Sequence, residues 1–161
     1  ESPVGVNTNL PNGLVAAAIE GGAVPALTGY TTHRREVKYG AENSRIDIFV
    51  DGHPEDPRPC YVEVKSVTLA VDGVAMFPDA VTKRGLKHLR ELGRVVAEGG
   101  RAVMFYLVQR GDCGRFAPAE HIDPAYAAGL REAQSCGVEV EVWTAEVGPD
   151  GVALGSKLPA A

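Results

Sequence analysis

Ser44-Arg-Ile-Asp-Ile-Phe49 and Tyr61-Val-Glu-Val-Lys-Ser66 are the two stretches that decide the fold of this chain. Each is typical of a short apolar strand, but each carries an acid where a buried strand usually has valine or isoleucine. Because side chains alternate between the two faces of a strand, Glu63 and Lys65 share one face and the valines beside them share the other. Asp47 offers a second carboxylate from what we expect to be the neighbouring strand.

Two carboxylates and a lysine that meet at a sheet edge can bind a hard divalent cation and hold a water molecule beside it. We therefore interpret Asp47 and Glu63 as ligands of Mg²⁺ or Mn²⁺, and Lys65 as the group that orients or deprotonates the attacking water. The competing interpretation is an ordinary amphipathic hairpin, because Glu-x-Lys is common on the solvated face of an antiparallel ribbon.

Length and composition favour one globular domain over residues 1–161. Hydrophobic residues make up 45% of the chain and charged residues 23%, and no apolar run approaches the roughly 18 residues of a membrane span.

The three cysteines, Cys60, Cys113 and Cys136, have no zinc-like spacing, so we expect a reduced, cytoplasmic protein without disulfides. Because the chain starts at Glu1 rather than Met, we expect a fragment of a longer protein.

The order of predicted elements indicates a small α/β domain. Helices are predicted over residues 11–20, 80–98 and 123–136, and strands over 28–39, 44–50, 60–71, 74–77, 101–109 and 138–147. The residues after 147 are expected to form a short ribbon or a loose tail. A meander of strands followed by helix-linked strands predicts a mixed β-sheet flanked by helices on both faces.

The helix predicted over 80–98 concentrates positive charge in an acidic chain. Residues 82–101 contain six basic and two acidic side chains, whereas the whole chain has a net charge of −5. Apolar positions at helical spacing are expected to face the sheet: Leu86, Leu89, Gly93 and Val96. A stripe of cations is expected on the opposite side: Lys83, Lys87, Arg90 and Arg94.

This stripe has two interpretations, a track for a DNA backbone or a solvated helix face. Arg84 and His88, one turn apart, are expected to reach phosphate near the site, with a packing role as the alternative for His88. Glu36 is a further candidate catalytic carboxylate, in the second shell or at a second metal. Its alternative is a cross-strand ion pair on a solvated face.

Short segments along most of the chain resemble the sugar fermentation stimulation protein A family. The segments are Asn7-Thr8, Leu10-Pro-Asn12, Gly29-Tyr30, Arg34-Arg-Glu-Val-Lys-Tyr-Gly40, Asn43-Ser-Arg-Ile-Asp47, Cys60-Tyr-Val-Glu-Val-Lys65, Phe77-Pro-Asp-Ala80 and Arg101-Ala-Val103. The element order, with Asp47 ahead of Glu63-x-Lys65, resembles the PD-(D/E)xK core of restriction endonucleases.

The resemblance implies a restriction-endonuclease-like, DNA-binding protein with a regulatory role in sugar (maltose) metabolism. It makes Mg²⁺-dependent phosphodiester hydrolysis by Asp47, Glu63 and Lys65 an expected activity, with a backbone carbonyl near Val64 as a further ligand. A non-specific DNA-binding regulator without cleavage activity is the alternative. An OB-like domain, typical ahead of this core in the family, is expected to be missing from this chain, and the homo-oligomeric state stays open. The early turn of the first helix has Asn12 where many nuclease cores have an acid, which puts a full two-metal arrangement in doubt.

Overall fold

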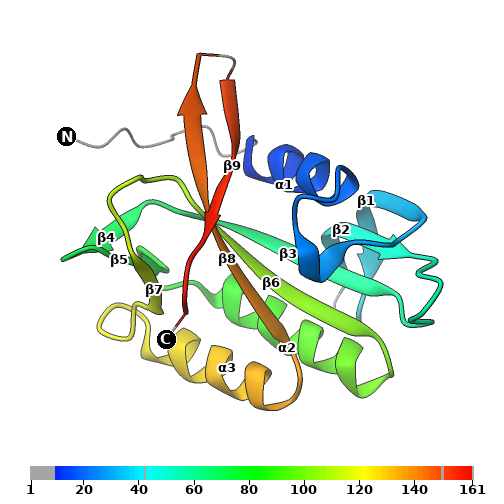
Figure 1. Ribbon diagram of the computed structural model, residues 1–161. Helices are drawn as coiled ribbons and strands as arrows, with labels where there is room; N and C mark the ends of the chain where they lie inside the picture. The colour runs from blue at the N-terminus through cyan, green and yellow to red at the C-terminus, as the bar shows by residue number, and fades with distance from the viewer. Residues whose placement is uncertain (1–9, 42, 150, 161) are drawn as a thin grey trace.

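The computed structural model describes residues 10–41, 43–149 and 151–160, which form a mixed sheet with helices on both faces (Figure 1). The predicted fold class is therefore confirmed. The segment Asn7-Thr8, used above for the resemblance, lies outside these residues. Within the described part of the chain, no helix is long and apolar enough to cross a membrane.

The helices are α1 (Leu10–Glu20), the 3₁₀ turn η1 (Pro25–Leu27), α2 (Lys83–Ala97) and α3 (Pro124–Ser135). The large sheet has the order β1-β2-β3-β6-β8-β9, formed by β1 (Thr32–Tyr39), β2 (Ser44–Asp51), β3 (Cys60–Val67), β6 (Arg101–Val108), β8 (Glu139–Gly148) and β9 (Gly151–Lys157). A small second sheet has the order β4-β5-β7, formed by β4 (Leu69–Val71), β5 (Val74–Phe77) and β7 (Arg115–Pro118).

The centre of the large sheet is parallel and its margins are antiparallel. β3, β6 and β8 run parallel to one another, whereas β1, β2 and β9 pair antiparallel with their neighbours. The crossovers between the parallel strands contain α2 and α3, which lie together beneath the sheet in Figure 1, while α1 lies above it. This arrangement follows from the right-handedness of β-α-β connections. When each new parallel strand is added on the same side of the last, right-handed connections place their helices on the same face of the sheet.

Two hydrophobic cores lie on opposite faces of the large sheet. On the α1 face, Val15 and Ile19 pack with Val103, Phe105 and Leu107 of β6. On the other face, apolar residues of α2 and α3 pack with the remaining side chains of β6. Both faces of β6 are therefore covered, as the apolar run over residues 101–109 predicts.

The strand predicted over residues 60–71 is wrong at its C-terminal end. β3 stops at Val67, opposite Val108, where its parallel partner β6 also stops. Beyond this point the described strands of the large sheet offer no neighbour, and Leu69–Val71 pairs with β5 through the turn at Asp72 and Gly73. Both turn residues have positive φ, 51° and 77°, as this type of tight hairpin requires.

α2 begins three residues later than predicted, because Thr82 forms its N-cap. The Thr82 hydroxyl accepts a hydrogen bond from Gly85 N at 2.9 Å, which satisfies one free donor of the first turn. The predicted sheet-facing side is only partly right: Leu89 is buried in the core shared with β6, but Leu86 and Gly93 line a groove beside α3. His88 and Glu91, which were not predicted to face inward, are buried. Helical spacing could not separate the two sides, since α2 packs against both the sheet and α3.

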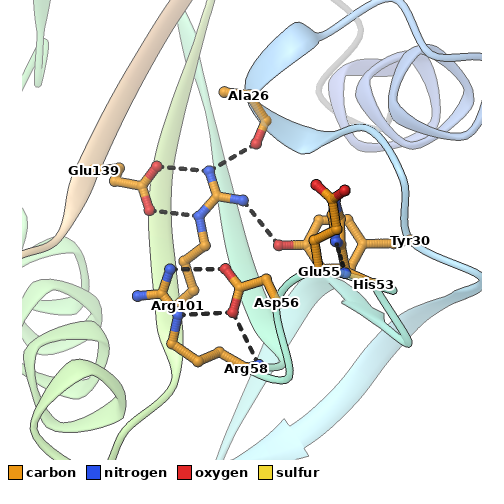
Figure 2. Close-up of polar contacts among 8 residues, drawn as sticks. All are labelled: Ala26, Tyr30, His53, Glu55, Asp56, Arg58, Arg101 and Glu139. Atoms are coloured by element: carbon orange, nitrogen blue, oxygen red, sulfur yellow. Dashed lines mark hydrogen bonds and ion pairs between the residues drawn. The ribbon is translucent and has the colours of Figure 1, made fainter.

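Arg101 belongs to the basic stretch of the sequence but does not point to solvent. Its guanidinium donates to both carboxylate oxygens of Glu139 on β8, each at 2.6 Å, to Tyr30 Oη at 2.8 Å and to the Ala26 carbonyl at 2.7 Å (Figure 2). One side chain therefore ties the start of β6 to β8 and to η1. This role is structural, and Arg101 is not available as a phosphate contact.

We expect Arg101→Gln to lower the free energy of unfolding by roughly 2 kcal/mol, less than for a fully buried pair because Glu139 is partly exposed. Urea titration followed by circular dichroism measures this value. Arg115→Gln, at an exposed position of β7, is the matched control and should change it by less than about 0.5 kcal/mol. An equal loss in both variants would contradict the structural role.

Candidate functional site

Asp47 lies where β2 separates from β3. The two strands pair from Val50 opposite Cys60 to Ile48 opposite Val62, and the pairing ends there. Beyond it, Asp47 Oδ2 accepts a hydrogen bond from the backbone N–H of Val64 at 2.8 Å. The carboxylate thus takes the place that a strand carbonyl would occupy.

The alternation of side chains between the two faces of the sheet is also interrupted in β2 at Asp47. Ile46 belongs to the core on the α2 face, whereas Ile48 belongs to the core on the α1 face. Strict alternation would put these two isoleucines on one face. The irregularity places the Asp47 side chain between the strands instead of in either core.

Asn12 of α1 holds Asp47 from the other side. Its Nδ2 donates to Asp47 Oδ1 at 3.0 Å, so both carboxylate oxygens accept a hydrogen bond. Burial raises the Asp47 pKa to about 6, and the nearby charge of Glu63 adds to the increase. The sequence singled out Asn12 only as a departure from other nuclease cores, and its contact with Asp47 was missed.

Glu63, Lys65 and His88 form a contiguous polar cluster beneath the sheet. Glu63 Oε1 lies 3.3 Å from Lys65 Nζ and 3.0 Å from His88 Nδ1, and the same ring nitrogen lies 3.0 Å from Lys65 Nζ. Because Nδ1 contacts both groups, it either donates to the carboxylate or accepts from the ammonium. The prediction that Glu63 and Lys65 share a face is confirmed, and His88 is a buried partner of both.

The oxygen set at this site suits a hard divalent cation. Within the described residues, no group of three His, Cys, Asp or Glu side chains is arranged to hold a metal ion, so an ion here would have at most two of these side chains as ligands. Glu63 is only 3% exposed, yet its Oε2 has no hydrogen-bond partner among the described residues. Asp47 keeps lone pairs beyond those used by Asn12 and Val64. The carboxylates of Asp47 and Glu63 are therefore of the donor type that Mg²⁺ and Mn²⁺ prefer.

A polar hollow of about 540 Å³ opens beside Asp47. Its lining comes from α1, β1, the β1–β2 turn, β2 and α2: Asn12, Glu36, Asn43, Ser44, Arg45, Asp47, Arg84, Lys87 and His88. Three cationic side chains thus share the hollow with two carboxylates, Glu36 and Asp47, a distribution of charge that suits an anionic ligand bound with a metal ion.

The six residues predicted to bind nucleic acid fall into two groups. Arg84, Lys87 and His88 line the hollow. Lys83, Arg90 and Arg94 are exposed on α2, although Arg94 also lines a hollow with Tyr39 and Tyr61 of the sheet. Both interpretations of this exposed stripe, a phosphate track and a solvated face, fit that position.

Glu36 of β1 faces the hollow with an unusual backbone. Its φ is 55°, in the left-handed region that a non-glycine residue rarely adopts. The β1–β2 partners Arg35 with Ile48 and Val37 with Ile46 lie on either side of it, and its charge also raises the Asp47 pKa. Strained residues of this kind cluster at functional sites. The alternative of a cross-strand ion pair finds no partner for Glu36 in the described ranges.

Glu91 is a buried acid that the sequence analysis missed. It is 1% exposed, and its Oε1 accepts from Ser44 Oγ at 2.7 Å and lies 4.0 Å from Lys87 Nζ. In the sequence, Lys87 and Glu91 read as an ordinary i, i+4 surface pair. The available signal was the spacing of three residues between His88 and Glu91, which places both on the same side of α2.

Comparison with known proteins gives a consistent result. Residues 9–151 match the family model described as the sugar fermentation stimulation protein RE domain. The chain is 56% identical over 154 residues to a sugar fermentation stimulation protein homolog of Rhodospirillum centenum, covering 94% of this chain and 64% of the relative. A homolog from Geobacter sulfurreducens is 52% identical over 155 residues, covering 96% and 65%. The chain thus spans slightly less than two thirds of these relatives.

A solved structure of Pyrococcus furiosus SfsA in complex with Ca²⁺ is similar in fold to nearly the whole of this chain. The TM-score is 0.87 at 27% sequence identity, and the match covers 97% of this chain and 66% of the archaeal one.

We expect the Asp47 carboxyl to titrate near pH 6 in the metal-free protein. Its folded-state pKa lies above the ordinary aspartate value of 3.8, so the folded chain binds this proton more tightly than the unfolded chain. The resulting stabilisation is complete below the unfolded pKa and is lost as the pH rises through about 6. Side-chain ¹³C NMR measures the titration, and Glu63→Gln should lower the midpoint by removing a like charge. An ordinary midpoint near 4 would contradict this account.

Proposed function

The chain belongs to the sugar fermentation stimulation protein family, and on this premise we propose that it binds DNA and hydrolyses phosphodiester bonds with Mg²⁺ or Mn²⁺. One observation carries the proposal: the buried Glu63 carboxylate contacts Lys65 and His88 beside Asp47, next to a hollow with a cationic rim. A metal-dependent nuclease needs this combination of hard oxygen ligands, a nearby proton-transfer group and phosphate-binding cations.

Each residue of the cluster has one task in this proposal. Asp47 and Glu63 would hold the cation, which supplies charge stabilisation at the phosphoryl oxygens and activates water when bound. Lys65 Nζ lies close enough to Glu63 to stay at the site, where it orients the water and screens developing negative charge. His88 contacts both groups and acts as a positioning residue for them.

The charge distribution supports a phosphate-bearing ligand. Arg45, Arg84 and Lys87 line the hollow in a protein whose net charge is −5, so binding should be confined to this face. No base-reading motif is evident, and we propose that phosphate contacts supply most of the affinity.

A second candidate function is DNA binding without cleavage. The observation that favours it is the double engagement of Asp47, whose oxygens accept from Asn12 and from Val64 N. Because Asp47 bridges the gap between β2 and β3 through these hydrogen bonds, it stabilises the fold even if no metal binds. The role in sugar metabolism rests on the name of the relatives and belongs to their whole length, of which this chain spans only a part.

The first test is metal-dependent nicking of supercoiled DNA. We expect the wild-type protein to nick with Mg²⁺ or Mn²⁺, and Glu63→Gln and Lys65→Met to lose about 100-fold or more of this rate. Glu132→Gln, exposed on α3, is the matched control and should keep full activity. Equal nicking by all variants would indicate a contaminant, and DNA binding with no nicking by any of them would favour the second candidate.

The second test counts phosphate contacts at the rim of the hollow. Arg84→Gln and Lys87→Gln should each weaken binding to unrelated DNA sequences equally and reduce the slope of log K against log salt by about 1. Fluorescence anisotropy at several salt concentrations measures this slope. Arg131→Gln, exposed on α3 away from the hollow, should leave the slope unchanged. A sequence-dependent loss would instead indicate base contacts.

A further inference from the structure

Lys38 on β1 and Arg45 on β2 lie directly opposite each other in the large sheet. Facing residues of an antiparallel pair have Cβ atoms about 5 Å apart, so like charges at such positions repel and destabilise the sheet. Both side chains are exposed, and neither forms an ion pair or a hydrogen bond with another residue in the described ranges. The chain therefore keeps a repulsive pair that a single carboxylate at either position would make attractive.

Protection of the sheet edge explains only one of these two charges. β1 is an outermost strand of the large sheet, and edge strands often carry charged side chains that discourage pairing with another chain. Arg45, however, lies on β2, which is an inner strand. An acid at position 45 would leave the edge equally protected and would stabilise the pairing of β1 with β2, so the second cation needs another reason.

Both cations point toward the α1 side of the sheet. The neighbouring facing pair, Val37 with Ile46, belongs to the core on the α2 face. Since side chains alternate along a strand, Lys38 and Arg45 are directed the other way. The position of Arg45 agrees, because it lines the polar hollow together with Asn12 of α1.

Arg35 adds a third cation on this side, because the alternation is interrupted between it and Lys38. Its facing residue Ile48 packs in the core on the α1 face, and its Nη1 lies 3.9 Å from where a Cβ of Gly13 in α1 would be. Three residues of an extended strand span about 10 Å, so Arg35 and Lys38 are spread along β1. With Arg45 they form what we call the β1–β2 cationic surface.

This surface and the first turns of α2 flank the hollow. Arg84 and Lys87 line the hollow from α2, whereas Arg45 lines it from β2 and is continued by Lys38 toward the edge of the sheet. A polyanion that runs through the hollow would meet positive charge both before and after it. A single phosphate group would reach only one of the two sets of cations.

We propose that the β1–β2 cationic surface binds the phosphate backbone of DNA where it leaves the hollow, with one phosphate held jointly by Lys38 and Arg45. The phosphate removes their mutual repulsion, and two cations already placed opposite each other bind it with little reorganisation. The inference deepens the proposed function and rests on it for the path of the DNA. The substrate class that it implies is a polynucleotide that continues on both sides of the cleaved bond.

Thermal unfolding at low salt and without DNA tests the repulsion. Lys38→Gln should raise the melting temperature by about 1 °C and Lys38→Glu by about 2 °C, because the first removes a like charge and the second adds an attractive pair. Arg115→Gln, exposed on β7, is the matched control and should shift it by less than about 0.5 °C. A lower melting temperature in Lys38→Gln would show that the lysine already has a stabilising partner and would overturn the inference.

Fluorescence anisotropy with a labelled DNA duplex in EDTA tests the binding. Lys38→Gln and Arg45→Gln should each weaken the affinity by about fivefold, and the double variant by well under the product of the two losses, because both cations hold one phosphate. The double variant should reduce the slope of log K against log salt by about 1. Lys38→Glu should bind most weakly of the single variants although it is the most stable, so unfolding does not mimic the result.

Wild-type affinity and salt slope in Lys38→Gln and Arg45→Gln would overturn the inference and leave the proposed function standing on Arg84 and Lys87. A wild-type chain that binds no DNA would refute the proposed function and this extension together. Losses that multiply fully in the double variant would refute the shared phosphate. Arg115→Gln should bind as the wild type does.

Discussion

The hydrogen bond from Val64 N to the Asp47 carboxylate is the interaction on which the rest of the site depends. A backbone donor at the point where two strands separate needs an acceptor, and a buried N–H without one is rare in native proteins. Asp47 supplies the acceptor and is in turn held by Asn12 of α1. The opening between β2 and β3 is therefore stable, and it leaves room for Glu63 and for the hollow beside it.

Burial and charge act against each other at this opening. Removing Asp47 from water disfavours its charged form, which is why the Asp47 pKa is raised. Lys65 and His88 compensate Glu63 from one side only. If the proposed cation binds here, it competes with the proton for the same carboxylate oxygens.

The sequence predicted the fold class, the covered central strand β6 and the shared face of Glu63 and Lys65, because period-two alternation and apolar runs report directly on strand faces. It could not place the end of β3, because Val67 and Leu69 are equally suited to a strand. β3 ends at Val67 because its partner β6 ends opposite it, at Val108. It also could not show that Glu91 is buried, because the acid follows Lys87 by four residues as surface pairs do. The role of Asn12 depends on a contact 35 residues away, which no local pattern reveals.

The parallel pairing of β3 with β6 has a consequence for how the protein tolerates sequence change. Glu63 and Lys65 sit on the same strand as Val62 and Val64, so a slip of one residue would exchange charged and aliphatic side chains between the two cores. Such a slip would bury an ion pair against Val15 and Ile19 and would expose the valines to His88. A misregistered chain thus loses stability on both faces of the sheet. We therefore expect functional variants to tolerate insertions or deletions in β3 less often than substitutions.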